Sequence, residues 1–255
     1  MDTMSKTASE LKHSAIVYTY PCGVVDIIHS TSGFMEAGWE ARIPEGGPKP
    51  SPRKAGEIAK GADLERSMRR ARAKLRRLAL ANDFRWFVTL TLDPAKIDRD
   101  DGKAVAHALG RWADNMVRRK GLKYVLVPEL HKKGGIHFHG FFNDAVEVVD
   151  SGHFDSAGHP VFNLPEWPLG FTTAIELYGE YPSAVGYVTK YIGKQGVRPM
   201  GRWYYSGGAL KEPTKTYADL DRDELRQEYC GQAVEFSIPG GNLMVIHTKE
   251  DCNDL

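Results

Sequence analysis

The sequence predicts an α+β protein in which antiparallel strands carry helices packed on one side. Short stretches that alternate apolar and polar residues, typical of half-buried strands, are interspersed with longer stretches whose apolar residues recur every three or four positions, typical of amphipathic helices. At 255 residues the chain suits one sizeable domain with an extension, or at most two small domains. Its 42% hydrophobic and 26% charged residues are ordinary for a globular protein.

The N-terminal part combines a small β-rich piece, a linker and a basic helix. Residues 15–20 and 24–28 are rich in strand-forming residues and are separated by a Pro-Cys-Gly turn, which predicts a small sheet or hairpin. Residues 44–52, PEGGPKPSP, have the composition of a linker. Asp63 is expected to cap a helix that runs to about Ala81, with an apolar stripe at Leu64, Met68, Ala71, Leu75 and Leu78.

The rest of the chain predicts alternating strands and helices. The expected strands are 86–92, 123–130, 136–142 and 171–178, the expected helices are 104–120 and about 182–194, and a final strand or hairpin is expected at 235–247. Residues 131–135 contain two glycines and predict a hairpin loop. Residues 143–168 and 202–220 are polar or broken by Gly and Pro and are expected to be loops.

Composition limits the possible environments and partners. The three cysteines, Cys22, Cys230 and Cys252, form no C-x-x-C pair, which favours free thiols in a reducing compartment and argues against a zinc ribbon. No apolar stretch reaches membrane-spanning length and the N-terminus has no signal-peptide core, so we expect a cytoplasmic protein with no membrane partner.

Positive charge is concentrated around the first predicted helix. Residues 53–77 hold ten Lys/Arg and three acids, a local balance of 10 − 3 = +7 in a chain whose net charge is +1. This distribution favours a surface for phosphates, and the candidate DNA-binding residues are Arg66, Arg69, Arg70, Arg72 and Arg76. A solvated basic face on a packed helix remains the alternative.

A candidate metal site comes from two predicted strands. Residues two apart in a strand point the same way, so His137 and His139 share one face while Phe138 faces the core. Folding the hairpin brings Glu129 opposite or diagonal to His137, close enough to be a third ligand. Two imidazoles and a carboxylate leave coordination positions open and suit Mg²⁺ or Mn²⁺. A surface histidine pair or a non-catalytic zinc site is the alternative.

Reactive side chains also share one stripe of a predicted helix. At 100° per residue Tyr187, Tyr191 and Lys194 align, with Lys190 beside them, while Val185, Val188 and Ile192 form a neighbouring apolar face. Tyrosine can act as a covalent nucleophile, and a nearby ammonium favours its ionised form. Two ordinary tyrosines on a half-buried helix are the alternative.

Three motifs carry a resemblance to a known family. FVTLTLD at 87–93, PELHKKGGIHFHGF at 128–141 and YVTKYIGK at 187–194 resemble, in this order, the motifs of HUH endonucleases. More narrowly they resemble rolling-circle replication initiators of phages, prophages and plasmids, in the two-tyrosine class of gene A and gene II proteins. The resemblance covers about residues 62–246, and residues 1–60 match nothing in this family.

The resemblance implies a five-stranded antiparallel sheet of ferredoxin-like or RNA-recognition-like topology within an endonuclease domain at 61–250, flanked by an extension at 1–60 and an acidic tail at 251–255. It implies nicking and rejoining of single-stranded DNA at a replication origin through a 5′-phosphotyrosine. It makes His137, His139 and Glu129 metal ligands, Tyr187 and Tyr191 nucleophiles, and Lys194, with Lys190, assisting groups. No G-x-x-x-x-G-K-[ST] motif occurs, so a host helicase and polymerase are expected partners in trans.

Several alternatives stay open. An HUH transposase or relaxase would use the same chemistry, although many relaxases place tyrosine before the histidines. A non-catalytic single-stranded DNA-binding module, or a metal-dependent hydrolase that activates water, would need no tyrosine nucleophile. Tyr187 and Tyr191 are each followed three residues later by lysine, so each fits a one-tyrosine signature and one or both could attack.

Overall fold

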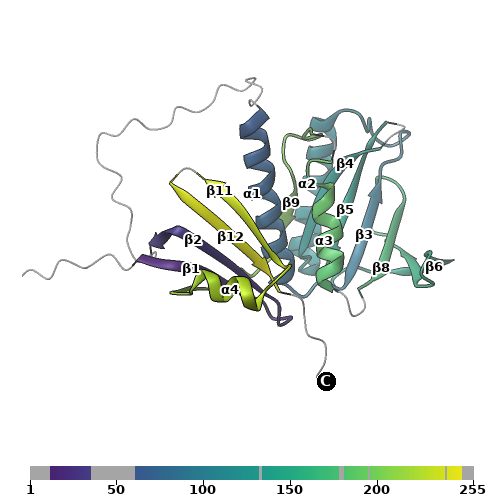
Figure 1. Ribbon diagram of the computed structural model, residues 1–255. Coiled ribbons are helices and arrows are strands. Elements are labelled where there is room, and N and C mark those ends of the chain that lie inside the picture. Colours follow the sequence, from purple (N-terminus) through teal and green to yellow (C-terminus); the bar gives the residue numbers. More distant parts are fainter. Residues whose placement is uncertain are drawn as a thin grey trace, which may run out of the picture. The chain divides into compact units, whose positions relative to one another are not determined.

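The computed structural model describes residues 12–35, 61–131, 134–177, 181–194, 196–238 and 240–248. The expected linker at 44–52 and the acidic tail at 251–255 lie outside these residues. The chain divides into two compact units, one formed by 59–212 and the other by 1–58 together with 213–255. Each unit has its own antiparallel sheet (Figure 1), which confirms the predicted α+β class.

The unit at 59–212 is built on a seven-stranded sheet of order β6-β7-β8-β3-β5-β4-β9. In chain order its elements are α1 (Gly61–Leu80), β3 (Trp86–Thr91), α2 (Gly102–Lys120), β4 (Tyr124–Leu130), β5 (Ile136–Phe142), β6 (Val149–Phe154), β7 (Pro160–Asn163), β8 (Thr172–Glu176), α3 (Tyr181–Tyr191) and β9 (Tyr205–Gly207). If β3, β4, β5 and β8 are counted as strands one to four, their spatial order is 4-1-3-2, the ferredoxin-like order that the resemblance implies.

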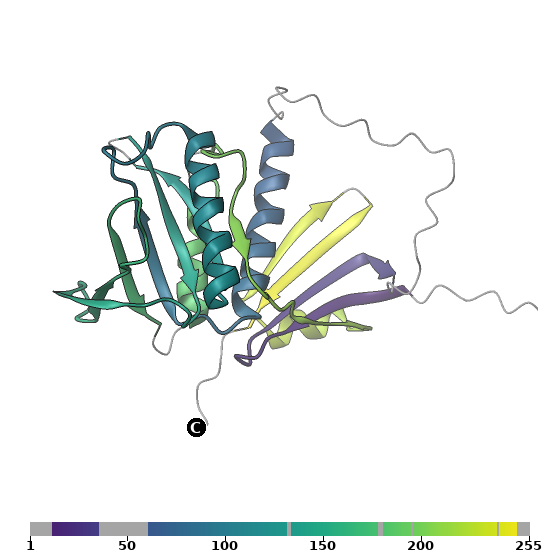
Figure 2. The ribbon, with the colours of Figure 1, turned by 180° about the vertical axis from the view of Figure 1, so that it is seen from behind.

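Helices cover the two faces of this sheet differently. Inward-facing residues of β3 and β5, such as Leu90 and Phe138, form the main core with Leu109 and Trp112 of α2. The opposite face carries α3, which contacts β4 and β5, and α1, which packs on α3 and β4. Figures 1 and 2 show these two sides of the sheet in turn. The period-2 alternation of β3 and β5 therefore sends alternate side chains to α2 and to α3.

Two segments expected to be loops contain strands. Residues 143–168 hold the β6–β7 hairpin, and residues 202–220 hold β9 and β10 (Thr214–Ala218). These two predictions were wrong because the strands are short and lie at the sheet edges, where they are held by main-chain pairing. Five of the six side chains of β6 are exposed, so its sequence carries no apolar alternation.

The second unit has a five-stranded sheet of order β10-β1-β2-β12-β11. It consists of β1 (Lys12–Thr19), β2 (Val25–Met35), β10, α4 (Arg222–Glu228), β11 (Ala233–Ile238) and β12 (Gly241–His247). The predicted N-terminal hairpin and C-terminal hairpin are both present, and β12 pairs with β2. The structure thus divides the chain at residue 212, whereas the sequence predicted an endonuclease domain that continued to 250.

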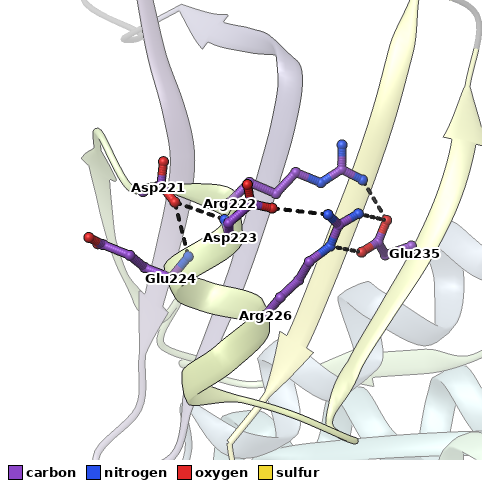
Figure 3. A network of polar contacts seen from close by, with 6 residues as sticks. All are labelled: Asp221, Arg222, Asp223, Glu224, Arg226 and Glu235. Carbon is purple, nitrogen blue, oxygen red and sulfur yellow. Dashed lines mark hydrogen bonds and ion pairs between the residues drawn. The ribbon is translucent and has the colours of Figure 1, made fainter.

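Helix α4, which the sequence analysis did not predict, is held to β11 by charge (Figure 3). Asp221 caps the helix by accepting hydrogen bonds from the backbone N–H groups of Asp223 and Glu224. Arg226 donates to both carboxylate oxygens of Glu235, at 2.7 and 2.9 Å, and Arg222 donates to the same carboxylate at 2.5 Å. These arginines hold the pKa of Glu235 at about 2.

Within the described residues, no helix combines the length and hydropathy needed to cross a membrane.

Candidate active site

The β4–β5 hairpin sets the positions of the three expected metal ligands. Glu129 lies directly opposite His137, and His139 lies opposite Val127. The hairpin turns through Gly134 and Gly135, whose φ angles of 85° and 83° lie in the region that favours glycine. His137 and His139 are half-buried and alternate with buried Ile136 and Phe138, so the two imidazoles share the face that carries α3.

Glu129 is the centre of a polar cluster. One carboxylate oxygen lies 3.1 Å from Nε2 of His139, and the other accepts a hydrogen bond of 2.8 Å from Nζ of Lys194. The side chains of Glu129 and His139 are only 15% and 14% exposed, whereas that of Lys194 is 55% exposed. On the far side of the ring, Nδ1 of His139 lies 3.2 Å from the hydroxyl of Thr89 on β3. The imidazole is therefore held from both ends.

Helix α3 is shorter than predicted, and this changes how Lys194 reaches the cluster. Val185, Val188 and Ile192 are fully buried, as the apolar stripe predicts. The helix ends at Tyr191, and Gly193 follows with a φ of 75°. A Cβ at Gly193 would approach Sδ of Met68 to 1.9 Å, so both backbone angle and space require glycine. Lys194 lies in the turn beyond the helix and donates to Glu129.

The two tyrosines lie together beside His139. The Tyr191 ring stacks on the His139 ring, with centroids 4.3 Å apart and an interplanar angle of 14°. Its hydroxyl donates to the Tyr187 hydroxyl at 2.5 Å. Burial, and next the contact with Tyr187, raise the pKa of the Tyr191 phenol well above its usual value. Tyr187 is 49% exposed and packs edge-on against Phe87.

His137 has a different set of neighbours. Its ring stacks on His131 with centroids 4.8 Å apart. Burial is the main cause that lowers the pKa of His137, the nearby His131 and Arg99 lower it further, and Glu129 opposes the shift. His139 also has a lowered pKa, chiefly through burial and against the influence of Glu129.

The expected ligands share one face but do not all converge. Among the described residues, no three His, Cys, Asp or Glu side chains are grouped tightly enough to hold a metal ion. Glu129 contacts His139, whereas Glu129 and His137 are related by strand pairing alone. The donor set of one carboxylate and two imidazoles nevertheless fits a divalent cation. The ion pair between Lys194 and Glu129 shows that this carboxylate already attracts a cation.

The five candidate arginines do not form one class. Arg66, Arg69 and Arg70 are exposed on α1, and Arg66 forms a 3.6 Å ion pair with Asp63. Arg72 instead donates through Nε and Nη2 to the backbone carbonyl of Ile192, at 3.1 and 2.7 Å. Arg76 is half-buried. Lys190, the remaining candidate, is exposed on α3.

Sequence reasoning assigned no site role to Thr89 or Arg99 and no structural role to Arg72. Thr89 could have been found from register, since β3 places it directly opposite His139. The role of Arg72 depends on a packing contact between α1 and the end of α3 across 120 residues of sequence, and no local pattern signals it. Arg99, whose side chain lies against Gly135, belongs to the segment between β3 and α2, which the predicted elements did not include.

Residues 85–196 match the model of a family of replication-associated proteins, that of ORF2 and gene II protein. This region is similar to replication-associated proteins. The match spans less than half of the chain, and it contains every residue of the cluster from Thr89 to Lys194. It includes neither α1 nor any element of the second unit. No curated protein and no solved structure shows significant similarity to the chain.

Proposed function

We propose that this protein initiates rolling-circle replication by nicking and rejoining single-stranded DNA at a replication origin, using tyrosine as the nucleophile. The observation that carries the proposal is the packing of Tyr191 against His139, with Tyr187, Glu129 and Lys194 in direct contact around the pair. The similarity to replication-associated proteins supports the biological role. A host helicase and polymerase would act in trans.

In the nicking step a phenol oxygen attacks the scissile phosphorus. The new bond joins this oxygen to phosphorus, and the bond from phosphorus to the 3′ oxygen breaks. The DNA then carries a 5′-phosphotyrosine on one side and a 3′ hydroxyl on the other, because the leaving oxygen takes up a proton as the phenol loses one. Rejoining reverses these changes, with the 3′ hydroxyl as nucleophile, and needs no external energy source.

Lys194 is well placed to assist the transfer. Its Nζ lies 5.0 Å from the centroid of the Tyr191 ring and beside Glu129. The hydrogen bond to Glu129 raises the pKa of Lys194, so the side chain is an ammonium at neutral pH. An ammonium there favours the ionised phenol and neutralises charge on the attacked phosphate.

A divalent metal, Mg²⁺ or Mn²⁺, would be held by Glu129, His137 and His139. When bound, it would polarise the scissile phosphate and stabilise the 3′ leaving oxygen. Thr89 would orient His139 by accepting a hydrogen bond from Nδ1–H, which leaves Nε2 as the ligand atom.

The DNA-free arrangement keeps the nucleophile inactive. The raised pKa and the hydrogen bond to Tyr187 hold the Tyr191 phenol in its protonated form. Attack therefore needs a change at this contact when DNA enters, which limits wasteful reaction with water or other phosphates.

The test is incubation of the full chain with single-stranded origin-bearing DNA and Mn²⁺, followed by denaturing electrophoresis. We expect a protein–DNA adduct that survives denaturation. In the Tyr187→Phe/Tyr191→Phe variant we expect no adduct and no cleavage. If that variant still cleaves, a hydrolase that activates water is correct instead. If wild-type protein binds the DNA without cleaving it under these conditions, the non-catalytic binding module is correct.

A further inference from the structure

An exposed aromatic residue extends the row of residues that contains the candidate metal ligands. Antiparallel pairing aligns Thr91 with His137 and His137 with Glu129 across β3, β5 and β4. On the other side of β3, the register with β8 continues to Phe171, whose backbone carbonyl accepts a 2.8 Å hydrogen bond from the N–H of Thr91. Phe171, Thr91, His137 and Glu129 thus form one row, and paired residues project to the same face.

Alternation along β8 supports this placement. Thr172 and Ala174 are buried, and Ala174 belongs to the core under α2, whereas Thr173 between them is exposed. Phe171 is therefore on the side of the sheet that carries Tyr191 and His139. Helix α3 covers β4 and β5 on that side, and the residues of β8 remain open.

Phe171 is 75% exposed, the largest exposure among the large apolar side chains of the described residues. Its backbone is nevertheless held tightly. Thr91 donates to the carbonyl of Phe171 and Asp93 donates to that of Leu169, both at 2.8 Å. A Cβ on the intervening Gly170 would lie 2.2 Å from the carbonyl oxygen of Thr91, so only glycine permits this approach. An exposed ring on a rigid backbone is pre-organised for a ligand.

We propose that Phe171 is a stacking platform for a DNA base next to the scissile phosphate. This inference rests on the proposed function and identifies a residue that would position the substrate. Strands lie about 4.8 Å apart, so Phe171 is roughly 10 Å from His137 along the row. Its near neighbours on the open face, Thr173 and Thr91, are small and polar, and Lys194 and Arg99 lie on the metal-ligand side of the row. Cations for phosphate and a ring for a base match single-stranded DNA better than an apolar protein surface.

The matched control is Phe154 on β6, which is 69% exposed in the same sheet but belongs to an edge hairpin away from this row. Four proteins are compared, namely wild type, Phe171→Ala, Phe171→Trp and Phe154→Ala. The probe is a fluorescein-labelled oligothymidylate of about 16 nucleotides, a length that spans the usual single-stranded site sizes. Anisotropy titrations are made with EDTA present, so that binding is measured apart from metal-dependent cleavage.

We expect Phe171→Ala to weaken binding by about 5- to 100-fold, the range for loss of one base–aromatic stack. Phe171→Trp should bind within about threefold of wild type, and Phe154→Ala within about twofold. A 5-iododeoxyuridine version of the probe should crosslink to Phe171 under near-ultraviolet light. The inference is overturned if Phe171→Ala binds like Phe154→Ala, if Trp does not restore the affinity, or if crosslinks form only elsewhere.

These outcomes are separable from those of the proposed function. A covalent adduct in wild type without any binding loss in Phe171→Ala rejects the platform and retains the nuclease. A binding loss in Phe171→Ala without any adduct in wild type retains the platform and rejects the nuclease.

Discussion

Arg72 is expected to stabilise the tyrosine helix rather than to bind DNA. Its guanidinium donates twice to the carbonyl of Ile192, just past the C-terminal end of α3, where backbone carbonyls lack helical partners and a cation is favourable. Arg72→Met keeps the aliphatic stem and removes the donors. A hydrogen bond from a charged group contributes about 1.5–3 kcal/mol. Because both N–H groups share one oxygen and Arg72 is half-buried, we count one bond at the lower end, about 1.5 kcal/mol.

Urea denaturation measures this loss, and Arg69→Met on the exposed side of α1 is the control. The control should change the free energy of unfolding by no more than about 0.5 kcal/mol. In DNA titrations the pattern should reverse. Arg69→Met should lower the slope of log K against log salt by about 0.7 if it contacts one phosphate, and Arg72→Met should leave the slope unchanged. Equal stability losses in the two variants, or a lower salt slope in Arg72→Met alone, would refute the reasoning.

Three further predictions concern catalysis and the second unit. If both tyrosines are nucleophiles, Tyr187→Phe and Tyr191→Phe should each retain some covalent adduct on denaturing gels; complete loss in Tyr191→Phe with normal cleavage and joining in Tyr187→Phe would leave one nucleophile. His137→Ala combined with His139→Ala should abolish nicking while preserving much single-strand binding, since binding rests on basic and aromatic groups; full nicking by wild type in EDTA would contradict the metal requirement. The depressed pKa of Glu235, caused by Arg226 and then Arg222, means that its stabilising effect is present above about pH 4.5 and is lost as pH falls toward about 2. Glu235→Gln should therefore flatten the dependence of unfolding free energy on pH in that window, and an unchanged slope would reject the role of the carboxylate.

The predicted elements that agree with the structure are those whose burial imposes a period. The strand expected at 86–92 and the helix expected at 104–120 are found at Trp86–Thr91 and Gly102–Lys120. Both contribute to the main core, so their apolar positions had to recur every second or every third to fourth residue. The exposed edge strands and α4 are stabilised by main-chain pairing and ion pairs, which leave no such period in the sequence.

The same distinction applies within the candidate site. Strand alternation and hairpin pairing placed His137 opposite Glu129, and the apolar stripe of α3 placed its two tyrosines on one side. These relations follow from backbone geometry alone. Side-chain partners do not. Glu129 bonds to His139, which lies two residues along the strand from its register partner His137, and His137 stacks on His131 instead. Such choices depend on rotamers and charge that the sequence does not reveal.

Lys194 shows why the difference matters for mechanism. A helix continued to residue 194 would align this lysine with Tyr187 and Tyr191 along one stripe. The structure ends the helix at Tyr191 and reverses the chain through Gly193, whose backbone angle and contact with Met68 exclude other residues. The ammonium is thereby brought to Glu129 and to the ring of Tyr191 at the same time. Glycine at 193 therefore has a role in placing a charge, because it joins the carboxylate expected to attract a cation to the phenol expected to attack.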